Sequence, residues 1–169
     1  MTELTYAARA ARDAVTPRRR FENLLDRYEG RLRRVAFGML GDPNRIDDVL
    51  QEAFIKAYRH LPDRFDSERA EAAWLYRIVH RCCLDELRRR RRRPETPGLP
   101  EVPAREVTES AAVIAAALAT LPADLRAVVL LIDVVGLDYE TAATALRVPR
   151  GTVASRLSVA RSRLQGVLR

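Results

Sequence analysis

Apolar residues recur at steps of three and four along most of this chain, the spacing that is typical of amphipathic helices. The first run of this kind ends at Gly41, because glycine favours the end of a helix. The next run follows Asp42-Pro43, a pair that supplies an N-cap and a proline for the first turn. The apolar positions of the two runs are Phe21, Leu24, Leu25, Tyr28, Leu32, Val35, Ala36 and Met39, and then Ile46, Val49, Leu50, Ala53, Phe54, Ala57 and Tyr58.

A third helix is predicted after the break at Leu61-Pro62 and a polar loop that extends through Asp66-Ser67. It begins near Glu68 and continues into six consecutive arginines, Arg88 to Arg93. Its apolar positions are Trp74, Leu75, Ile78, Val79 and Cys82. No useful length of sequence alternates with a period of two, so no strand is predicted.

Two segments fall outside this helical pattern. Residues 1–19 are rich in alanine and arginine and are interrupted by Pro17, which indicates a loosely ordered extension. Residues 94–108 contain four prolines, a density that excludes a helix and is typical of an extended, semi-stiff linker. The linker divides the rest of the chain into two blocks, residues 20–93 and residues 109–169.

The second block predicts four short helices. The first extends from about Glu109 to Thr120, and the second is closed by Gly136. Asp138 caps the third helix, and a turn with Pro149 and Gly151 starts the fourth. The apolar positions of the last three helices are Leu125, Val128, Val129, Ile132 and Val135, then Tyr139, Ala142, Ala143 and Leu146, then Val153, Leu157, Ala160 and Leu164. The sequence therefore predicts an all-α protein of two small helical domains joined by a proline-rich linker.

The composition of the chain indicates which kind of partner it binds and where in the cell it works. The 169 residues carry a net charge of +7 and a pI near 10.2, so a polyanion is the natural partner. The most apolar segment, Ala111 to Leu121, is shorter than the ~20 residues that cross a bilayer, so no membrane insertion is expected. The start of the chain lacks a secretory signal, and adjacent Cys82 and Cys83 cannot form a disulfide framework. These features favour a cytoplasmic protein.

The segment from Asp138 to Leu164 has the plan of a helix-turn-helix, whose second helix enters the major groove of DNA. On that helix, small hydroxyl residues lie opposite the apolar positions and arginines lie on the flanks. Small hydroxyl side chains can approach base edges, and guanidinium groups can hold phosphates. The alternative interpretation is a helical hairpin with a solvated basic face.

Two further polar faces are candidates for binding. The second predicted helix places an isoleucine within an acidic face, which indicates either a protein-binding surface or an ordinary solvated side. The third predicted helix has a basic outer face that the arginine run extends, which favours nucleic acid over a merely solvated domain edge. The first face consists of Asp48, Gln51, Glu52, Ile55 and Arg59, and the second consists of Tyr76, Arg77, His80, Arg81 and Arg88. In the loop before the third helix, Arg64 could steady an unpaired base and Phe65 could stack on it.

Catalytic chemistry finds little support in this sequence. The chain has two histidines, His60 and His80, and it has no serine nucleophile motif or phosphate-binding glycine loop. Neighbouring side chains on a helix point about 100° apart, so Cys82 and Cys83 cannot comfortably share a metal ion. We expect neither enzymatic activity nor a metal or cofactor.

Four segments, in this order and spacing, resemble the extracytoplasmic-function (ECF) group of bacterial RNA polymerase sigma factors. They are residues 47–65, 73–89, 121–146 and 148–164. The resemblance implies that the chain binds core RNA polymerase and promoter DNA, with the first domain on the clamp of the largest subunit and the second domain near the subunit flap. It also implies an anti-sigma factor as a partner. A stand-alone helix-turn-helix regulator, or an adaptor that binds polymerase without DNA, is the alternative.

The resemblance also implies a role for each polar face. The acidic face Asp48 to Arg59 would dock on core polymerase, and the third helix with its preceding loop would open the −10 element. The −35 element would be read by Arg150, Thr152, Ser155, Arg156, Ser158, Val159 and Arg163. The sequence departs from the common pattern of the group at His80, Arg81, Ala154, Ser158 and Val159, which puts the preferred promoter sequence in question.

Overall fold

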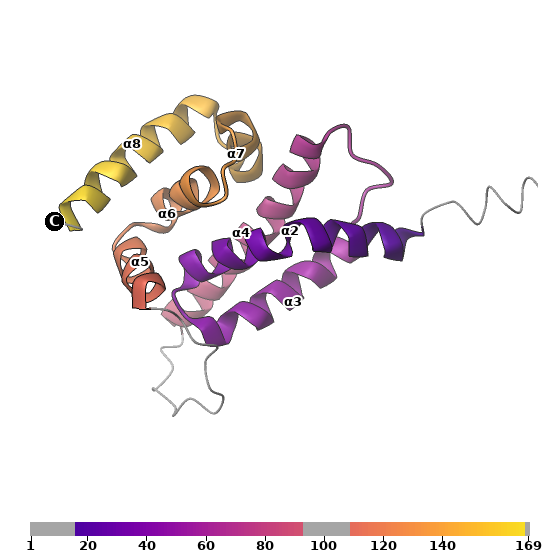
Figure 1. Ribbon diagram of the computed structural model, residues 1–169, viewed down its shortest axis with the longest axis horizontal. Helices are drawn as coiled ribbons and strands as arrows, with labels where there is room; N and C mark the ends of the chain where they lie inside the picture. The colour runs from indigo at the N-terminus through magenta and orange to yellow at the C-terminus, as the bar shows by residue number, and fades with distance from the viewer. Residues whose placement is uncertain (1–15, 93–108, 168–169) are drawn as a thin grey trace, which may run out of the picture.

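The computed structural model describes residues 16–92 and 109–167, and within them every regular element is a helix. Figure 1 shows three long helices, then several short ones, and finally another long helix at the C-terminal end. The all-α prediction is therefore confirmed for the described part of the chain. The elements are α2 (Pro17–Leu40), α3 (Pro43–Arg59), α4 (Glu68–Arg92), α5 (Glu109–Ala119), α6 (Ala123–Val129), the π-helical turn η1 (Leu130–Val134), α7 (Tyr139–Leu146) and α8 (Arg150–Val167).

Helix α2 starts earlier than predicted. The side chain of Thr16 accepts a hydrogen bond from the backbone N–H of Arg19 at 3.3 Å, and Pro17 occupies the first turn. A proline at this place supports a helix start because its missing N–H would have had no partner there. Residues 17–19 thus belong to α2, and the prediction that they are part of a loose extension is wrong. Residues 1–15 of that extension and the whole of the predicted linker, residues 94–108, lie outside the described residues.

The turn between α2 and α3 follows the prediction closely. Gly41 takes a left-handed φ of +66° and its N–H bonds to the carbonyl oxygen of Phe37 at 2.7 Å. Asp42 then caps α3 by accepting from the N–H of Asn44 at 3.0 Å. Helices α2, α3 and α4 pack against one another in pairs and form the first half of the core.

The helix-turn-helix is present, although its turn differs in one detail. Asp138 caps α7 through the N–H of Thr141 at 2.9 Å, as predicted. The left-handed position that ends α7 is Arg147, with a φ of 56°, and Gly151 lies inside α8. Arg147 could not be predicted at this position, because a non-glycine residue in this conformation is uncommon.

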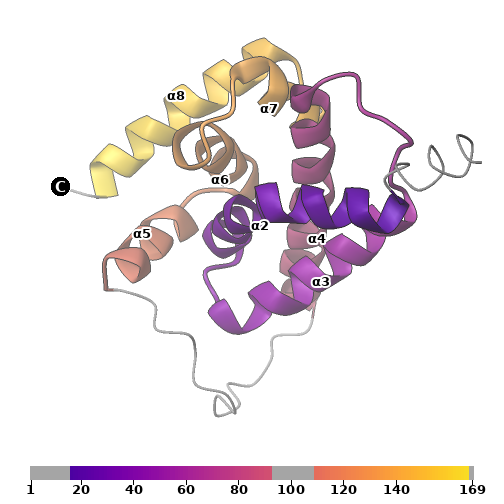
Figure 2. The ribbon, with the colours of Figure 1, turned by 45° about the vertical axis from the view of Figure 1, so that its right-hand side comes forward.

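The two blocks pack on each other and share one hydrophobic core. Figure 2 shows α7 beside the start of α4, while α5 and α6 lie along the end of α2. The two blocks come very close at Gly38 of α2, where an added Cβ would clash with the side chain of Leu130. Nearby, the guanidinium of Arg126 donates to the carbonyl oxygen of Met39. The sequence predicted two domains, but it gave no indication that they would close on each other.

Candidate functional site

The acidic face of α3 is exposed as predicted. Asp48, Gln51, Ile55 and Arg59 are exposed, and Glu52 is partly exposed. Ile55 is 46 % exposed, an unusual degree for an isoleucine. Lys56 donates to the carboxylate of Glu52 at 2.6 Å, so part of the acidic charge is neutralised locally.

An apolar groove runs beside this face, between α2 and α3. Tyr58, which the sequence assigned to the core, is 49 % exposed and packs edge-on against Phe21 with ring centroids 5.3 Å apart. The groove is lined by Phe21, Arg33, Asp47, Leu50, Gln51, Phe54, Ile55, Tyr58 and Arg59. Apolar walls with charged rims are typical of a surface that binds another protein.

The predicted DNA face of α8 is also open to solvent. Arg150, Ser155, Ser158, Val159 and Arg163 are exposed, while Thr152 and Arg156 are partly buried. The guanidinium of Arg156 lies 3.4 Å from the carboxylate of Asp124, which holds this side chain toward α6. The face therefore presents small side chains with basic groups at its margins, as the sequence predicted.

A polar groove next to α8 adds residues that the sequence analysis missed. It is lined by Tyr139, Ala154, Leu157, Ser158, Arg161, Ser162 and Gln165. Arg150 lies 5.9 Å above the ring of Tyr139, in a cation–π geometry that links the starts of α7 and α8. Tyr139 was assigned only as an apolar position of α7, because helical periodicity cannot show that its ring borders a groove.

The residues predicted to contact the −10 element fall into two groups. Arg64, Arg81 and Arg88 are exposed, and Phe65 is partly buried against Trp74 with ring centroids 5.3 Å apart. Arg88 forms an ion pair with Asp85 at 3.1 Å on the surface of α4. These four residues lie where a nucleic acid can reach them.

Tyr76, Arg77 and His80 form the second group. The predicted outer position is wrong for Tyr76, whereas Arg77 and His80 are partly exposed. Tyr76 is fully buried, with its ring edge-on to Tyr28, and burial raises the pKa of Tyr76 to about 12. Burial, with a smaller effect of Arg88, lowers the pKa of His80 to about 4. Arg77 donates to the carbonyl oxygen of Thr144 in α7 at 2.8 Å. Tyr76 thus packs on α2, and Arg77 contacts α7 of the second block.

Part of the arginine run has an internal role. Glu86 is only 3 % exposed and accepts hydrogen bonds from Arg89 at 2.6 Å and from Arg90 at 3.2 Å. Arg90 also reaches Asp42 at 3.1 Å, and so ties the end of α4 to the turn between α2 and α3. The whole run is thus not a free phosphate-binding surface.

Other kinds of site find no support in the described residues. No three histidine, cysteine, aspartate or glutamate side chains there are grouped as a metal ion requires. The thiols of Cys82 and Cys83 are buried, and burial raises the pKa of both. No helix within residues 16–92 and 109–167 is long and apolar enough to span a membrane.

Two family models match the two blocks of the chain. Sigma-70 region 2 matches residues 24–93 and Sigma-70, region 4, matches residues 111–164. The ECF RNA polymerase sigma factor SigM of Mycobacterium tuberculosis is 36 % identical over 152 residues, which cover 88 % of this chain and 76 % of SigM. The RNA polymerase sigma-H factor of Pseudomonas aeruginosa is 32 % identical, and the match covers 89 % of this chain and 87 % of sigma-H.

Solved structures agree with these sequence matches. CnrH, in complex with the cytosolic domain of CnrY, has a TM-score of 0.70 and 29 % identity, covering 96 % of this chain and 94 % of CnrH. The sigma factor RpoE of Bartonella quintana, in complex with the anti-sigma factor NepR, has a TM-score of 0.73 and 27 % identity. That match covers 89 % of this chain and 97 % of RpoE. The chain therefore belongs to the ECF group of the sigma-70 family, the non-enzymatic subunits that bind core RNA polymerase and direct it to promoters.

Proposed function

We propose that this sigma factor docks on the clamp of the largest polymerase subunit through the exposed face of α3. The observation that carries this assignment is Ile55, 46 % exposed among Asp48, Gln51 and Glu52 at the edge of an apolar groove. An apolar centre within a charged rim is the arrangement from which protein interfaces gain affinity and orientation. The second domain would contact the subunit flap.

Promoter DNA would be held at two places. The exposed side of α8 fits the major groove of the −35 element, with Arg150 and Arg163 as phosphate contacts. The loop before α4, with Arg64 and Phe65, and the residues Tyr76, Arg77, His80, Arg81 and Arg88 of α4 would hold unpaired bases of the −10 element. Two tethered contacts of moderate strength together bind more tightly than either one.

An anti-sigma factor is a further expected partner. The structure of CnrH was solved with the cytosolic domain of CnrY, and that of RpoE with the anti-sigma factor NepR. The apolar groove between α2 and α3 is the surface on which such a protein would compete with core polymerase. We place this activity in the cytoplasm, where the polymerase works.

The docking assignment is tested with purified core polymerase. We expect the parent chain to bind core and to support transcription from a bubble template. The double variant Asp48→Ala plus Glu52→Ala should lose core binding, whereas Glu22→Ala plus Asp26→Ala removes the same charge from exposed positions of α2 and should keep it. Equal core affinity of the two double variants contradicts the assignment. DNA binding without any core binding by the parent chain would support a stand-alone regulator.

A further inference from the structure

One thiol of this chain lies beside its single lysine. Nζ of Lys56, on α3, donates to Sγ of Cys82, on α4, at 3.6 Å. The two residues are 26 positions apart in the sequence, so the packing of α3 on α4 brings them together. An amine and a thiol in contact are two nucleophiles that can be joined by oxidation of the sulfur. Neither of them is among the residues assigned to polymerase or DNA.

A carboxylate completes this group. The ammonium of Lys56 also donates to Oε1 of Glu52 at 2.6 Å, one turn earlier in α3. The hydrogen bond to Glu52 raises the pKa of Lys56, so the amine is protonated at rest. A protonated amine cannot attack an electrophile, but here an acceptor for its proton is already in contact with it. The carboxylate, the amine and the thiol thus stand in the order that a proton transfer followed by attack on sulfur requires.

The lysine forms the exposed side of this group. The side chains of Lys56 and Glu52 are 46 % and 40 % exposed, whereas Cys82 is only 2 % exposed. Burial raises the pKa of the Cys82 thiol, and the charge of Lys56 partly opposes that rise. A buried, protonated thiol reacts slowly with bulky reagents. An oxidant therefore has to be small, and it reaches the sulfur when the flexible side chain of Lys56 moves aside.

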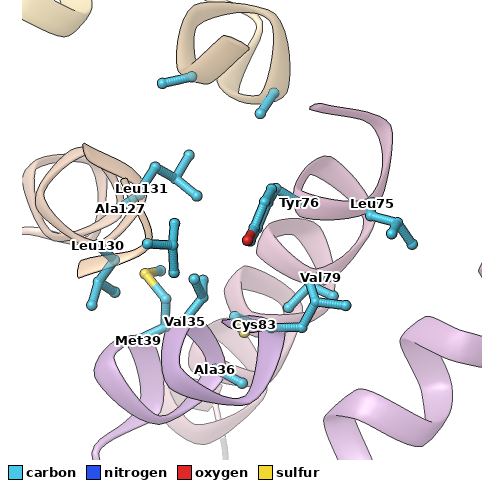
Figure 3. Close-up of a cluster of buried hydrophobic side chains, with 14 of the residues drawn as sticks. Val35, Ala36, Met39, Leu75, Tyr76, Val79, Cys83, Ala127, Leu130 and Leu131 are labelled. Atoms are coloured by element: carbon cyan, nitrogen blue, oxygen red, sulfur yellow. The ribbon is translucent and has the colours of Figure 1, made fainter. Parts of the chain in front are cut away.

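The neighbouring cysteine has a different environment. Figure 3 shows Cys83 in the apolar cluster, with Val79 of the same helix and with Val35 and Ala36 of α2. Its residue is fully buried, and burial raises the pKa of its thiol to about 12. Successive side chains on a helix point about 100° apart, so Cys82 faces Lys56 while Cys83 faces the core. Cys83 is thus an internal control for the reactivity of Cys82.

We propose that Cys82 and Lys56 form a reversible covalent cross-link, a sulfenamide, when the protein meets hydrogen peroxide. The peroxide oxidises the thiol to a sulfenic acid, and its other oxygen leaves as water. Nζ of Lys56 passes one proton to Glu52 and attacks the sulfur, so that an S–N bond forms and the S–O bond breaks. The departing hydroxide takes a second proton from the nitrogen and leaves as water. Two molecules of a thiol such as glutathione reduce the cross-link to the free side chains and become a disulfide.

The cross-link changes the charge of the α3 face. The nitrogen of a sulfenamide carries no positive charge at neutral pH, so Glu52 loses its ion pair and the face becomes more negative by one charge. This consequence rests on the proposed function, which takes Asp48 and Glu52 as contacts with core polymerase. A partner surface that attracts these carboxylates binds the oxidised form more tightly. The formation of the cross-link itself does not depend on that assignment.

Mass spectrometry of the full-length chain tests the cross-link. After treatment with hydrogen peroxide and removal of the excess by catalase, the parent should lose the mass of two hydrogens. Trypsin should no longer cut after Lys56, and residues 46–59 should appear joined to residues 82–88. A disulfide between Cys82 and Cys83 has the same mass, but it leaves Lys56 open to trypsin. Dithiothreitol should restore both the mass and the cleavage.

Three variants identify the atoms involved. Lys56→Arg keeps a positive charge beside Glu52 but removes the amine, and Cys82→Ala removes the thiol, so neither should form the cross-link. Cys83→Ala is the matched control and should form it as the parent does. If circular dichroism shows that Cys82→Ala has lost helix, Lys56→Arg decides by itself. The proposal is overturned if the oxidised parent carries a sulfinic acid on Cys82 while Lys56 is still cleaved, or if Lys56→Arg also loses two hydrogens.

Titration of core polymerase tests the consequence for docking. The oxidised parent should bind about threefold more tightly than the reduced parent, as expected when one exposed ion pair is removed. Dithiothreitol should reverse this gain, and Cys82→Ala should bind equally before and after peroxide. Equal affinities of the oxidised and reduced parent overturn the consequence for docking. Absence of core binding by the reduced parent overturns the proposed function instead, and the peptide masses decide the cross-link in either case.

Discussion

Arg90 and Glu86 lie one turn apart in α4, with Nε of the guanidinium 3.2 Å from the carboxylate. The same guanidinium contacts Asp42, so the pair joins the end of α4 to the start of α3. The side chain of Glu86 is 4 % exposed and that of Arg90 is 30 % exposed, which makes this a largely buried ion pair. A basic segment that looks like a nucleic-acid contact in the sequence thus also stabilises the first domain.

Removal of Glu86 should destabilise the protein. Glu86→Ala leaves Arg89 and Arg90 without their buried acceptor, and breaking a largely buried pair of this kind costs about 2 kcal/mol or more. Urea denaturation followed by circular dichroism measures the change in the free energy of unfolding. The adjacent Asp85→Ala breaks only the exposed pair with Arg88 and should cost less than about 0.5 kcal/mol. Equal losses in the two variants would rule out an internal role for Glu86.

His80 should make stability depend on pH. Burial and Arg88 lower its pKa from 6.5 to about 4, so the unfolded chain binds a proton at a higher pH than the folded one does. The contribution of neutral His80 to the free energy of unfolding is therefore complete above about pH 6.5. It is lost as the pH falls toward 4, and the loss is roughly 3 kcal/mol at most. Between pH 7 and pH 4, the melting temperature should fall less steeply for His80→Gln than for the parent. His60→Gln, at an exposed position, should follow the parent.

The exposed isoleucine of α3 should matter for binding and not for folding. Ile55→Asp places a charge at the centre of the proposed docking face, and such central apolar contacts are often worth 2 kcal/mol or more. We expect a fall in core affinity of at least about thirtyfold in a fluorescence titration, with the melting temperature nearly unchanged. Val113→Asp alters a residue of α5 that is 55 % exposed and should leave core affinity intact. Comparable affinity losses in both variants would mean that the α3 face has no special role.

Arg163 should act as a phosphate contact of α8. It is exposed and has no ion pair within the described residues, so its charge is available to DNA. Arg163→Ala should weaken binding to duplex DNA of any sequence and reduce the slope of log K against log salt by about one. Arg31→Ala removes an exposed arginine of α2, far from α8 in sequence, and serves as the control for total charge. An unchanged slope for Arg163→Ala would remove this residue from the DNA contact.

Local chemistry explains why the sequence predicted most of the helices. Gly41, Asp42 and Asp138 end or cap helices through bonds to residues two to four positions away, and such bonds do not depend on the rest of the fold. The exposed faces of α3 and α8 follow in the same way from helical periodicity. The cap of α2 is equally local, because Thr16 and Pro17 stand side by side in the sequence.

Only the tertiary structure decided which polar faces are open. Tyr76, Arg77 and His80 share a helical side, but periodicity does not say which neighbour covers it. Arg77 contacts α7, whose Thr144 follows it by 67 residues, and Tyr76 packs on Tyr28 of α2. Helix α2 admits η1 because Gly38 has no side chain to meet Leu130. Such contacts depend on shape and distance between segments far apart in the chain. The sequence by itself thus determined the helices, the family resemblance and the open faces of α3 and α8. Packing between distant helices decided that Tyr76 is buried and that Arg77 and His80 are only partly exposed.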